Sequence, residues 1–209
     1  MPDNMIDKID WLGHGSFRVN ASKVVYFDPW EVKDEPKADI IFVSHEHYDH
    51  CSPEDIEKIS KGDTIIVTEP MAAKKLSGNL KVMKPGDSIE VSGISIKAIA
   101  SYNADKQFHP RGNNWLGFLV ELDGVKIYHS GDTDYIPEMD NLEVDIALLP
   151  VSGTYVMDAS QAIEAARAMK PKIAVPMHYG KIVGTEDDAR KFEEVLKNEM
   201  KVVIKERVE

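Results

Sequence analysis

A short apolar run, Ile40–Val43, is followed at once by the polar segment 44–50, which reads SHEHYDH. The uninterrupted β-branched and aromatic run is typical of a strand buried on both faces. Beyond the polar segment, Ser52 and Pro53 form a typical helix start, with an N-cap residue and proline at the first helical position. We therefore expect the polar segment between a strand's carboxyl end and a helix, where open α/β sheets collect ligand sites.

The spacing of side chains in this segment suits metal binding. Residues two apart in an extended chain point to the same side, so His45 and His47 can converge on one ion. Asp49 and His50 follow as the chain turns and can face a second point nearby. Neutral imidazoles together with a carboxylate suit zinc, manganese or iron. The alternative is a solvated polar loop that happens to contain three histidines, and their clustering argues against it.

Three separated motifs make the chain resemble the metallo-β-lactamase superfamily. The pattern His-x-His-x-Asp-His at 45–50 is that superfamily's signature, and GDTD at 131–134 and PMHYG at 176–180 follow in the expected order. WLGHGS at 11–16 and YHS at 128–130 are typical of its small metal-dependent hydrolase branch, which includes lactonase-like and phosphodiesterase-like members. The resemblance implies an α/β fold, a four-layer αββα sandwich, as a single domain over residues 1–209.

The same resemblance implies a centre with two divalent metal ions. The expected ligands are His45 and His47 for the first ion, Asp49, His50 and His178 for the second, and Asp132 as a bridge between them. Zinc is the expected metal, although manganese or iron would also suit these ligands. A metal-bound hydroxide would attack an ester, a lactone or a phosphodiester of a small molecule. Asp49 has a second, catalytic role to consider, since its spare oxygen could orient the hydroxide or deliver a proton to the leaving group.

In the ligand set that the resemblance implies, the first ion lacks one ligand. Many relatives supply a third histidine before the bridging aspartate, where residues 101–103 of this chain read SYN. His109 could reach back from the long polar loop 101–114, Asn103 could bind through its amide oxygen, or water could take the position. Pro110 restricts the preceding histidine towards extended geometry, and imidazole is a better zinc ligand than a neutral amide. We therefore favour His109.

Further residues are candidates for supporting the ligands or for contacting a substrate. By resemblance, Asp28 is expected to hold the ligand loop. His14 lies between two glycines, where the backbone can approach other elements closely, and is either a hydrogen-bond donor to the centre or a structural histidine. The other candidates are Tyr102, Asn103, His129 and Tyr155.

An alternative function is metal binding with a redox or structural role, because the same fold also hosts di-iron oxygen-reducing domains. Those domains usually replace the second histidine of the motif with glutamate, whereas His47 is intact here. This difference favours the hydrolase.

Charge and cysteine content limit the partners. The formal net charge of −11 argues against a polyanionic partner, although two divalent ions would add about four positive charges locally. We expect a small-molecule substrate, no nucleic acid and no membrane partner, and leave a homo-oligomer open. The start of the chain does not resemble a signal peptide. The one cysteine, Cys51, is predicted to be a buried thiol. A cytoplasmic location is therefore the simplest expectation.

Hydrophobic periodicity and turn residues predict the elements. Strands are expected over 6–12, 16–19, 24–27, 64–68, 116–122, 125–129, 144–149, 173–175 and 202–204, with further strands between 80 and 99. Helices are expected over 53–60, 70–76 and 186–199, and a further helix is expected to be capped by Asp158 and to run through Met169.

Overall fold

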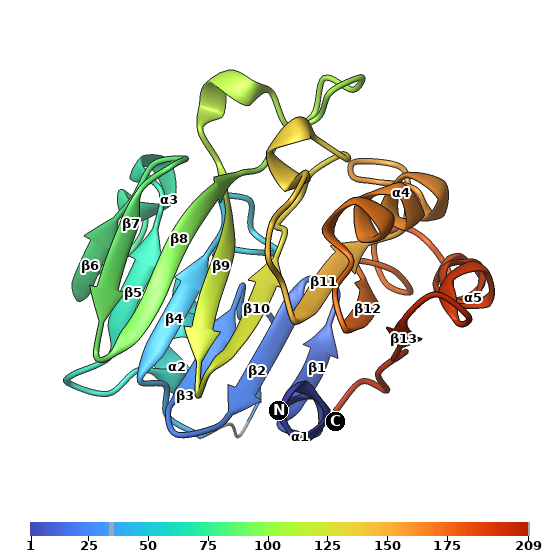
Figure 1. Ribbon diagram of the computed structural model, residues 1–209. Coiled ribbons are helices and arrows are strands. Elements are labelled where there is room, and N and C mark those ends of the chain that lie inside the picture. Colours follow the sequence, from blue (N-terminus) through green and yellow to red (C-terminus); the bar gives the residue numbers. More distant parts are fainter. Residues whose placement is uncertain (34–35, 209) are drawn as a thin grey trace.

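Two β-sheets packed face to face form the centre of the fold in the computed structural model, which describes residues 1–33 and 36–208 (Figure 1). The first sheet has the order β1 (Ile9–Gly13), β2 (Ser16–Asn20), β3 (Val24–Phe27), β4 (Ile40–Val43), β5 (Ile65–Thr68) and β6 (Asn79–Val82). The second has the order β13 (Lys201–Val202), β12 (Ile173–Met177), β11 (Ile146–Pro150), β10 (Val125–His129), β9 (Leu116–Leu122), β8 (Ile94–Ala100) and β7 (Ser88–Val91).

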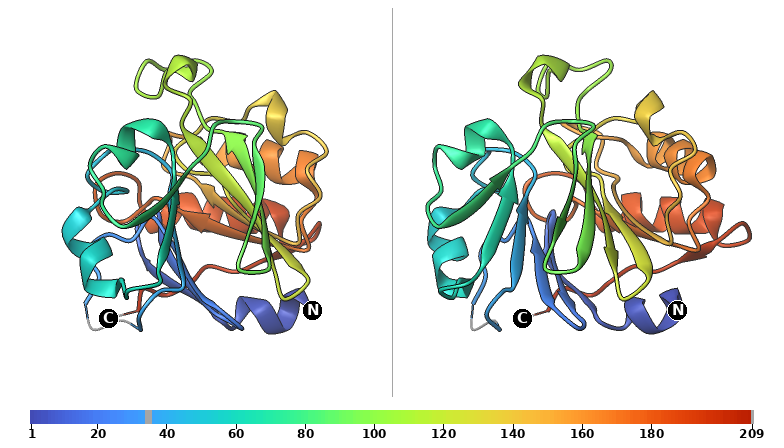
Figure 2. Two further views of the ribbon diagram at one scale, coloured as in Figure 1. Left: turned by 90° about the vertical axis from the view of Figure 1, so that its left-hand side faces the viewer. Right: turned by 60° about the vertical axis from the view of Figure 1, so that its left-hand side comes forward.

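Helices cover the outer sides of both sheets, as Figure 2 shows. Helices α2 (Pro53–Ile59) and α3 (Pro70–Ala73) pack on the first sheet, and α4 (Ala159–Met169) and α5 (Glu186–Leu196) pack on the second. Three short elements complete the described residues: α1 (Pro2–Ile6), η1 (Arg111–Asn113) and η2 (Pro137–Met139). This arrangement confirms the predicted αββα fold class.

Strand β4 explains how the sequence positions the polar segment after it. All four of its residues are buried, and it lies between β3 and β5, parallel to both. Ile40 and Phe42 face the core between the sheets, whereas Ile41 and Val43 pack with α2. Both faces of β4 are covered by apolar residues, which leaves no place for the polar side chains that begin at Ser44. The strand therefore ends at Val43, and the polar segment follows as a loop. The N-cap is as predicted: Ser52 Oγ accepts from the Asp55 N–H at 3.3 Å.

A tight hairpin connects β9 and β10 and leads the chain towards residues 130–134. Its turn residues, Asp123 and Gly124, have φ angles of +52° and +73°, as the mirror-image turns of β-hairpins require. The predicted strands 116–122 and 125–129 are confirmed. In the structure their register pairs Val125 with Leu122.

Several predicted element ends were wrong. Residue 6 ends helix α1 and does not begin a strand. Pro2 is the first residue of this helix, and the helix buries its residues Met5 and Ile6 against the core. Helix α3 ends at residue 73 instead of 76, α5 ends at 196 instead of 199, and the last strand covers only 201–202. Short elements depend on packing that local patterns do not contain.

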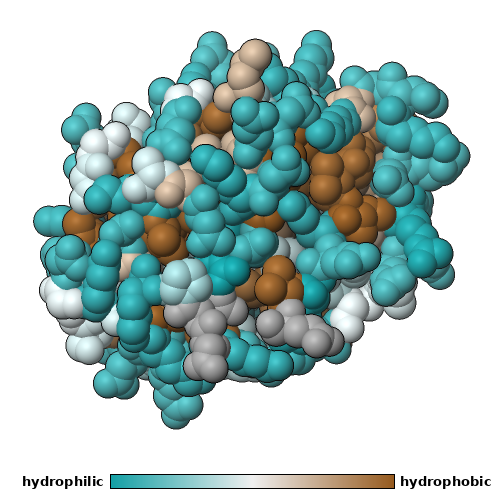
Figure 3. All heavy atoms as spheres, turned by 90° about the horizontal axis from the view of Figure 1, so that it is seen from below, coloured by the Kyte–Doolittle hydropathy of each residue, from teal (hydrophilic) through white to brown (hydrophobic). Residues whose placement is uncertain are grey.

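The surface seen from below, away from the loops that follow β8 and β10, is mainly hydrophilic with apolar side chains between (Figure 3). Within residues 1–33 and 36–208, we find no helix with the length and apolar character needed to cross a membrane.

Candidate metal centre

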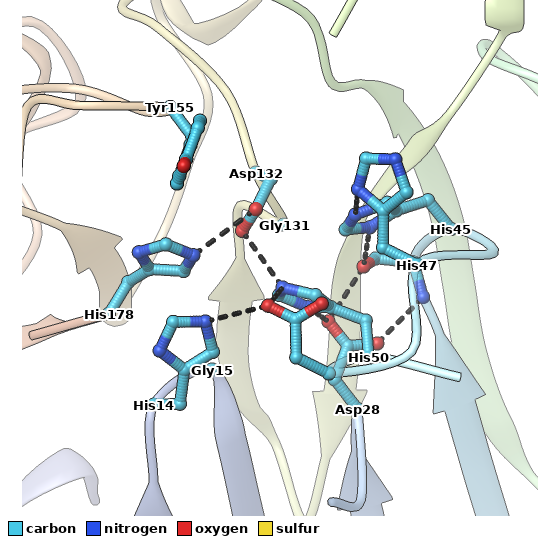
Figure 4. Close-up of polar contacts among 12 residues, drawn as sticks. His14, Gly15, Asp28, His45, His47, His50, Gly131, Asp132, Tyr155 and His178 are labelled. Carbon is cyan, nitrogen blue, oxygen red and sulfur yellow. Dashed lines mark hydrogen bonds and ion pairs between the residues drawn. The ribbon is translucent and has the colours of Figure 1, made fainter. Parts of the chain in front are cut away.

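Side chains that can bind metal meet where loops leave the two sheets (Figure 4). From the first sheet come the β1–β2 turn, with His14, and the segment after β4, with His45, His47, Asp49 and His50. From the second sheet come the β8–β9 loop, with His109, the segment after β10, with Asp132, and the residue directly after β12, His178. Each site therefore requires both sheets, and no single stretch of chain completes one.

The first group consists of His45, His47 and His109, whose ligand atoms all lie within 4.8 Å of one another. His45 Nε2 is 3.0 Å from His47 Nδ1, and His45 and His109 are buried while His47 is exposed. Of the three alternatives for the missing ligand, the structure brings His109 to this group. Asn103 supports it instead, since its Oδ1 accepts from the His109 N–H at 3.0 Å and its amide donates to Tyr155 O at 2.8 Å.

The second group consists of His14, Asp49, His50 and His178, again with ligand atoms within 4.8 Å. Asp49 Oδ2 lies 3.6 Å from His50 Nε2 and 3.0 Å from His14 Nε2. The three residues predicted for the second ion are thus together, and His14 joins them more closely than its sequence context indicated.

Asp132 lies between the two groups. Its Oδ2 is 3.2 Å from His178 Nε2 and 3.6 Å from His109 Nε2, and its Oδ1 is 3.3 Å from His50 Nε2. Figure 4 shows the carboxylate reaching towards both His178 and His50. One carboxylate therefore faces histidines of both groups, as a bridging ligand would.

Burial and neighbouring charges set the protonation of these groups. Burial holds the pKa of His45 well below its usual value, so its imidazole is neutral and able to bind metal. Burial also opposes a charge on His50, but the carboxylates of Asp132 and Asp28 outweigh it and raise the pKa. For Asp132 burial would raise the pKa, yet His178 and His50 bring it well below its usual value. The proton on His50 thus balances the buried carboxylates, a charge that a bound cation would replace.

Two buried atoms at the middle of the centre suit a metal ion. Among the described residues, His50 Nε2 and Asp132 Oδ1 face each other at 3.3 Å as an ion pair, both removed from solvent, and neither makes a hydrogen bond of good geometry. A bound cation would give each of these buried polar atoms a partner. Because imidazole nitrogens and carboxylate oxygens are ligands of zinc, manganese and iron, the described residues fit divalent ions at this place.

Four buried histidines of the two groups have partners at Nδ1 that fix their rings, whereas His14 is bonded through Nε2. The Nδ1 partners are Ser44 Oγ for His45 (2.9 Å), Asp28 Oδ2 for His50 (2.7 Å), Tyr155 O for His109 (2.9 Å) and Ser152 Oγ for His178 (3.1 Å). Such bonds direct Nε2 of each ring towards the centre. Asp28 also accepts from the Ser44 N–H at 2.7 Å and from its hydroxyl at 2.6 Å, so it holds the start of the ligand segment as expected.

Ser44 and Ser152 were not among the candidates from the sequence. Ser44 directly follows β4, and Ser152 lies two residues beyond β11. Both strands are buried and end at the metal centre. A polar residue at the end of such a strand was the available signal. Their partners, however, could be assigned only once the strands were placed side by side.

The remaining candidates lie around the centre in different ways. His129 is fully buried, with Nε2 2.8 Å from Gly15 O and its ring stacked on Phe27 at 5.2 Å. The Tyr102 hydroxyl turns away from the ligands and donates to Glu138 at 2.9 Å. Tyr155 supports His109 through its carbonyl. Cys51 is buried, and burial raises the pKa of its thiol to about 12, which makes the thiol inert at neutral pH.

Comparison with known proteins agrees with the motifs and the geometry. A model of the β-lactamase superfamily domain matches residues 8–178. A UPF0173 metal-dependent hydrolase of Thermoplasma acidophilum is 41% identical over 191 residues, covering 82% of this chain and 83% of the relative. The structure of a proposed metal-dependent hydrolase of Parabacteroides distasonis superposes with a TM-score of 0.85 at 36% identity, covering 96% of this chain and 93% of that one.

A more distant structure shares the fold alone. CmlA, a diiron β-hydroxylase of Streptomyces venezuelae, is 12% identical with a TM-score of 0.73, covering 93% of this chain and 52% of that one. The high identity and coverage of the hydrolases, together with the family match over most of the chain, decide the assignment. The chain belongs to the UPF0173 metal-dependent hydrolases of the metallo-β-lactamase superfamily.

Proposed function

We propose that this protein is a binuclear hydrolase that cleaves an ester, a lactone or a phosphodiester of a small molecule. The observation that carries the proposal is the position of Asp132, whose Oδ2 faces His178 and His109 and whose Oδ1 faces His50, so that one carboxylate contacts histidines of both groups. His45, His47 and His109 would hold the first ion, and Asp49, His50 and His178 the second. Zinc is the proposed metal because nitrogen ligands predominate.

Two bound divalent ions would supply a water activated at neutral pH and positive charge for the oxyanion that develops. The chain's own residues arrange this chemistry. Asp132 would fix the separation of the ions, and the Nδ1 partners would keep each Nε2 lone pair directed inwards. Ser44, which contacts both Asp28 and His45, ties the supports of the two groups together.

Asp49 has a more limited role than proton transfer. Burial would raise the pKa of its carboxyl, but the hydrogen bond from His14 and the charge of nearby His50 together outweigh burial and bring the pKa to about 2. A carboxyl so acidic carries no proton at neutral pH, so it is poorly suited to protonate a leaving group. We assign to it metal binding and orientation of the attacking water.

A redox role is the second candidate, supported by the shared fold of the diiron hydroxylase CmlA. The first group, His45, His47 and His109, is a histidine site that also suits iron. The identity to that enzyme is too low to transfer its activity, and the hydrolase remains the better-supported proposal.

Metal analysis combined with a substrate screen tests the proposal. Protein purified without chelator should hold two ions per chain and hydrolyse at least one chromogenic phosphodiester, ester or lactone. Chelation should abolish turnover, and zinc or manganese should restore it. Full activity in a preparation with one ion or none would refute the binuclear mechanism. An inactive two-ion protein that contains iron and reacts with oxygen would favour the redox role.

A further inference from the structure

The tight turn between β1 and β2 presses against the second ligand group. His14 occupies its tip with a φ of +52°, a conformation that side-chain-bearing residues adopt rarely. The following residue must be small, because a Cβ on Gly15 would come within 3.0 Å of His50 Cε1. The backbone of the turn therefore reaches contact distance of a predicted metal ligand.

The carbonyl of His14 anchors another predicted ligand. It accepts two hydrogen bonds, from the His178 N–H at 3.0 Å and from the Trp11 indole at 2.9 Å. His178 itself has a φ of +61°, so its backbone departs from the ordinary course of a strand end. The bond from the turn holds this unusual backbone position, which in turn directs the His178 side chain.

The His14 imidazole contacts a third predicted ligand, Asp49. Nε2 lies 3.0 Å from Asp49 Oδ2, whereas Nδ1 is buried with no hydrogen-bond partner. A neutral imidazole carries one N–H, and among the described residues only Nε2 has an acceptor within reach. His14 is therefore the donor and Asp49 the acceptor. This pattern is the reverse of the four buried histidines whose Nδ1 is engaged and whose Nε2 faces the centre.

The His14 ring packs more closely on the His178 ring than two ligands of one ion would. Its centroid is 3.8 Å from that of His178 at an angle of 41°, whereas the His50 and His178 rings are 5.8 Å apart. Two imidazoles that radiate from one tetrahedral ion have centroids about 5 Å apart, given zinc–nitrogen bonds of about 2 Å. The His14 ring lies against the His178 ring instead of beside it on a common ion.

We propose that His14 is a positioning residue of the second metal site, holding Asp49 through its imidazole and His178 through its carbonyl. The inference rests on the proposed two-ion centre. Within residues 1–33 and 36–208, His14 supplies the one side-chain hydrogen bond to the Asp49 carboxylate. Without that donor the carboxylate, whose side chain is 14% exposed, could rotate towards solvent and leave the second ion.

Two substitutions distinguish a donor from a ligand. His14→Gln places an amide N–H near the position of Nε2–H, whereas His14→Phe keeps a buried ring and removes the donor. Each variant is stripped of metal and titrated with zinc against a chromogenic chelator, which resolves the affinity of each ion. Cobalt absorption spectra of the reloaded proteins report on the ligands themselves, independently of turnover.

We expect His14→Phe to bind the second ion about 10–100-fold more weakly and the first ion nearly as the wild type does. His14→Gln should retain the second-ion affinity to within about three-fold, with an unchanged cobalt spectrum, because the donor is kept. Should His14→Phe fold poorly, the glutamine variant decides alone: wild-type affinity and spectrum support the donor role, and a changed spectrum overturns it.

Three other results would overturn the inference. Equal loss of the second ion in both variants would make His14 a ligand, and unchanged affinity in a folded His14→Phe would deny it any role. A wild-type protein that takes up a single ion would refute the proposed two-ion function, and this inference with it, so the two failures can be told apart.

Discussion

Asp28 Oδ2 lies 2.7 Å from Nδ1 of His50, and both side chains are buried. Because the carboxylate can only accept, it keeps a proton on Nδ1 and leaves Nε2, beside Asp132, as the nitrogen that can give up its proton to bind a metal ion. The contact thus sets the tautomer in which His50 can bind a metal ion.

Replacing Asp28 with Asn should reverse that tautomer. An amide group facing Nδ1 would donate, the ring proton would move to Nε2, and the affinity for the second ion should fall about 10–100-fold. Zinc titration of the metal-free variant measures the change. Asp10→Asn is the matched control, since Asp10 also accepts hydrogen bonds, from Arg18 and Asn20, and neither of these residues belongs to the two ligand groups. Equal zinc affinities in the two variants would contradict the assignment.

Removing the charge of Asp132 should have a larger effect. Asp132→Asn takes away the carboxylate that faces both ligand groups, so we expect lower occupancy of one or both sites and a loss of turnover by orders of magnitude. Elemental analysis and steady-state kinetics measure the two effects. Asp145→Asn, which alters a carboxylate bonded to Lys126 and Lys172, should keep both properties. Wild-type metal content and rate in Asp132→Asn would show that the assigned bridge is wrong.

The first site can be tested with two variants of the β8–β9 loop. His109→Ala should lose one ion, because it removes the third nitrogen of the first group. Asn103→Ala should retain two ions with weaker binding of the first, since Asn103 contacts the backbone of His109 and the carbonyl of Tyr155. Isothermal titration of each metal-free protein separates the cases. Two tightly bound ions in His109→Ala would transfer the ligand role to Asn103 or to solvent.

Acid should destabilise the protein partly through Asp39, which directly precedes β4. Burial would raise the pKa of this carboxyl, but hydrogen bonds from Lys61 and the Val24 N–H outweigh it and lower the pKa. A lowered folded-state pKa gives stability that is complete above the unfolded value, about 3.9, and is lost as pH falls through the folded value.

Asp39→Asn should therefore make the free energy of unfolding less dependent on pH. Urea unfolding of metal-free protein at about pH 6 and about pH 3 should show a smaller difference in the variant than in the wild type. Asp63→Asn serves as the control, because Asp63 pairs with the same lysine, Lys61, but its side chain is 83% exposed and the distance is 3.9 Å instead of 2.6 Å. Identical differences in wild type and Asp39→Asn would exclude the proposed contribution.

The predictions that held depended on local patterns. Strand β4 and the segment after it could be predicted because an apolar run, a polar cluster and a helix cap follow one another within fourteen residues, 40–53. The hairpin of β9 and β10 was likewise encoded in adjacent residues. Such signals require no knowledge of distant contacts.

What could not be predicted depends on contacts across the chain. The route of His109 towards His45 is fixed by hydrogen bonds to Tyr155 and by the buried Asp134, which accepts from Lys106 at 2.5 Å and from the Ala104 N–H at 2.9 Å. These partners are 28 to 46 residues apart, so periodicity within the loop contains no information about them. The bond between His14 and Asp49 spans 35 residues, so the sequence could offer His14 only as either a donor to the centre or a structural histidine, without naming its partner.

The division of the ligands between the two sheets has a consequence for the lifetime of the protein. His45 and His50 follow a strand of the first sheet, and Asp132 and His178 follow strands of the second, so a bound ion connects the sheets in the folded state only. Free metal at a hundred times the dissociation constant adds about 2.7 kcal/mol to the free energy of unfolding. Metal starvation would therefore increase the unfolded fraction that proteases degrade, and cellular abundance would follow metal supply without any change in synthesis.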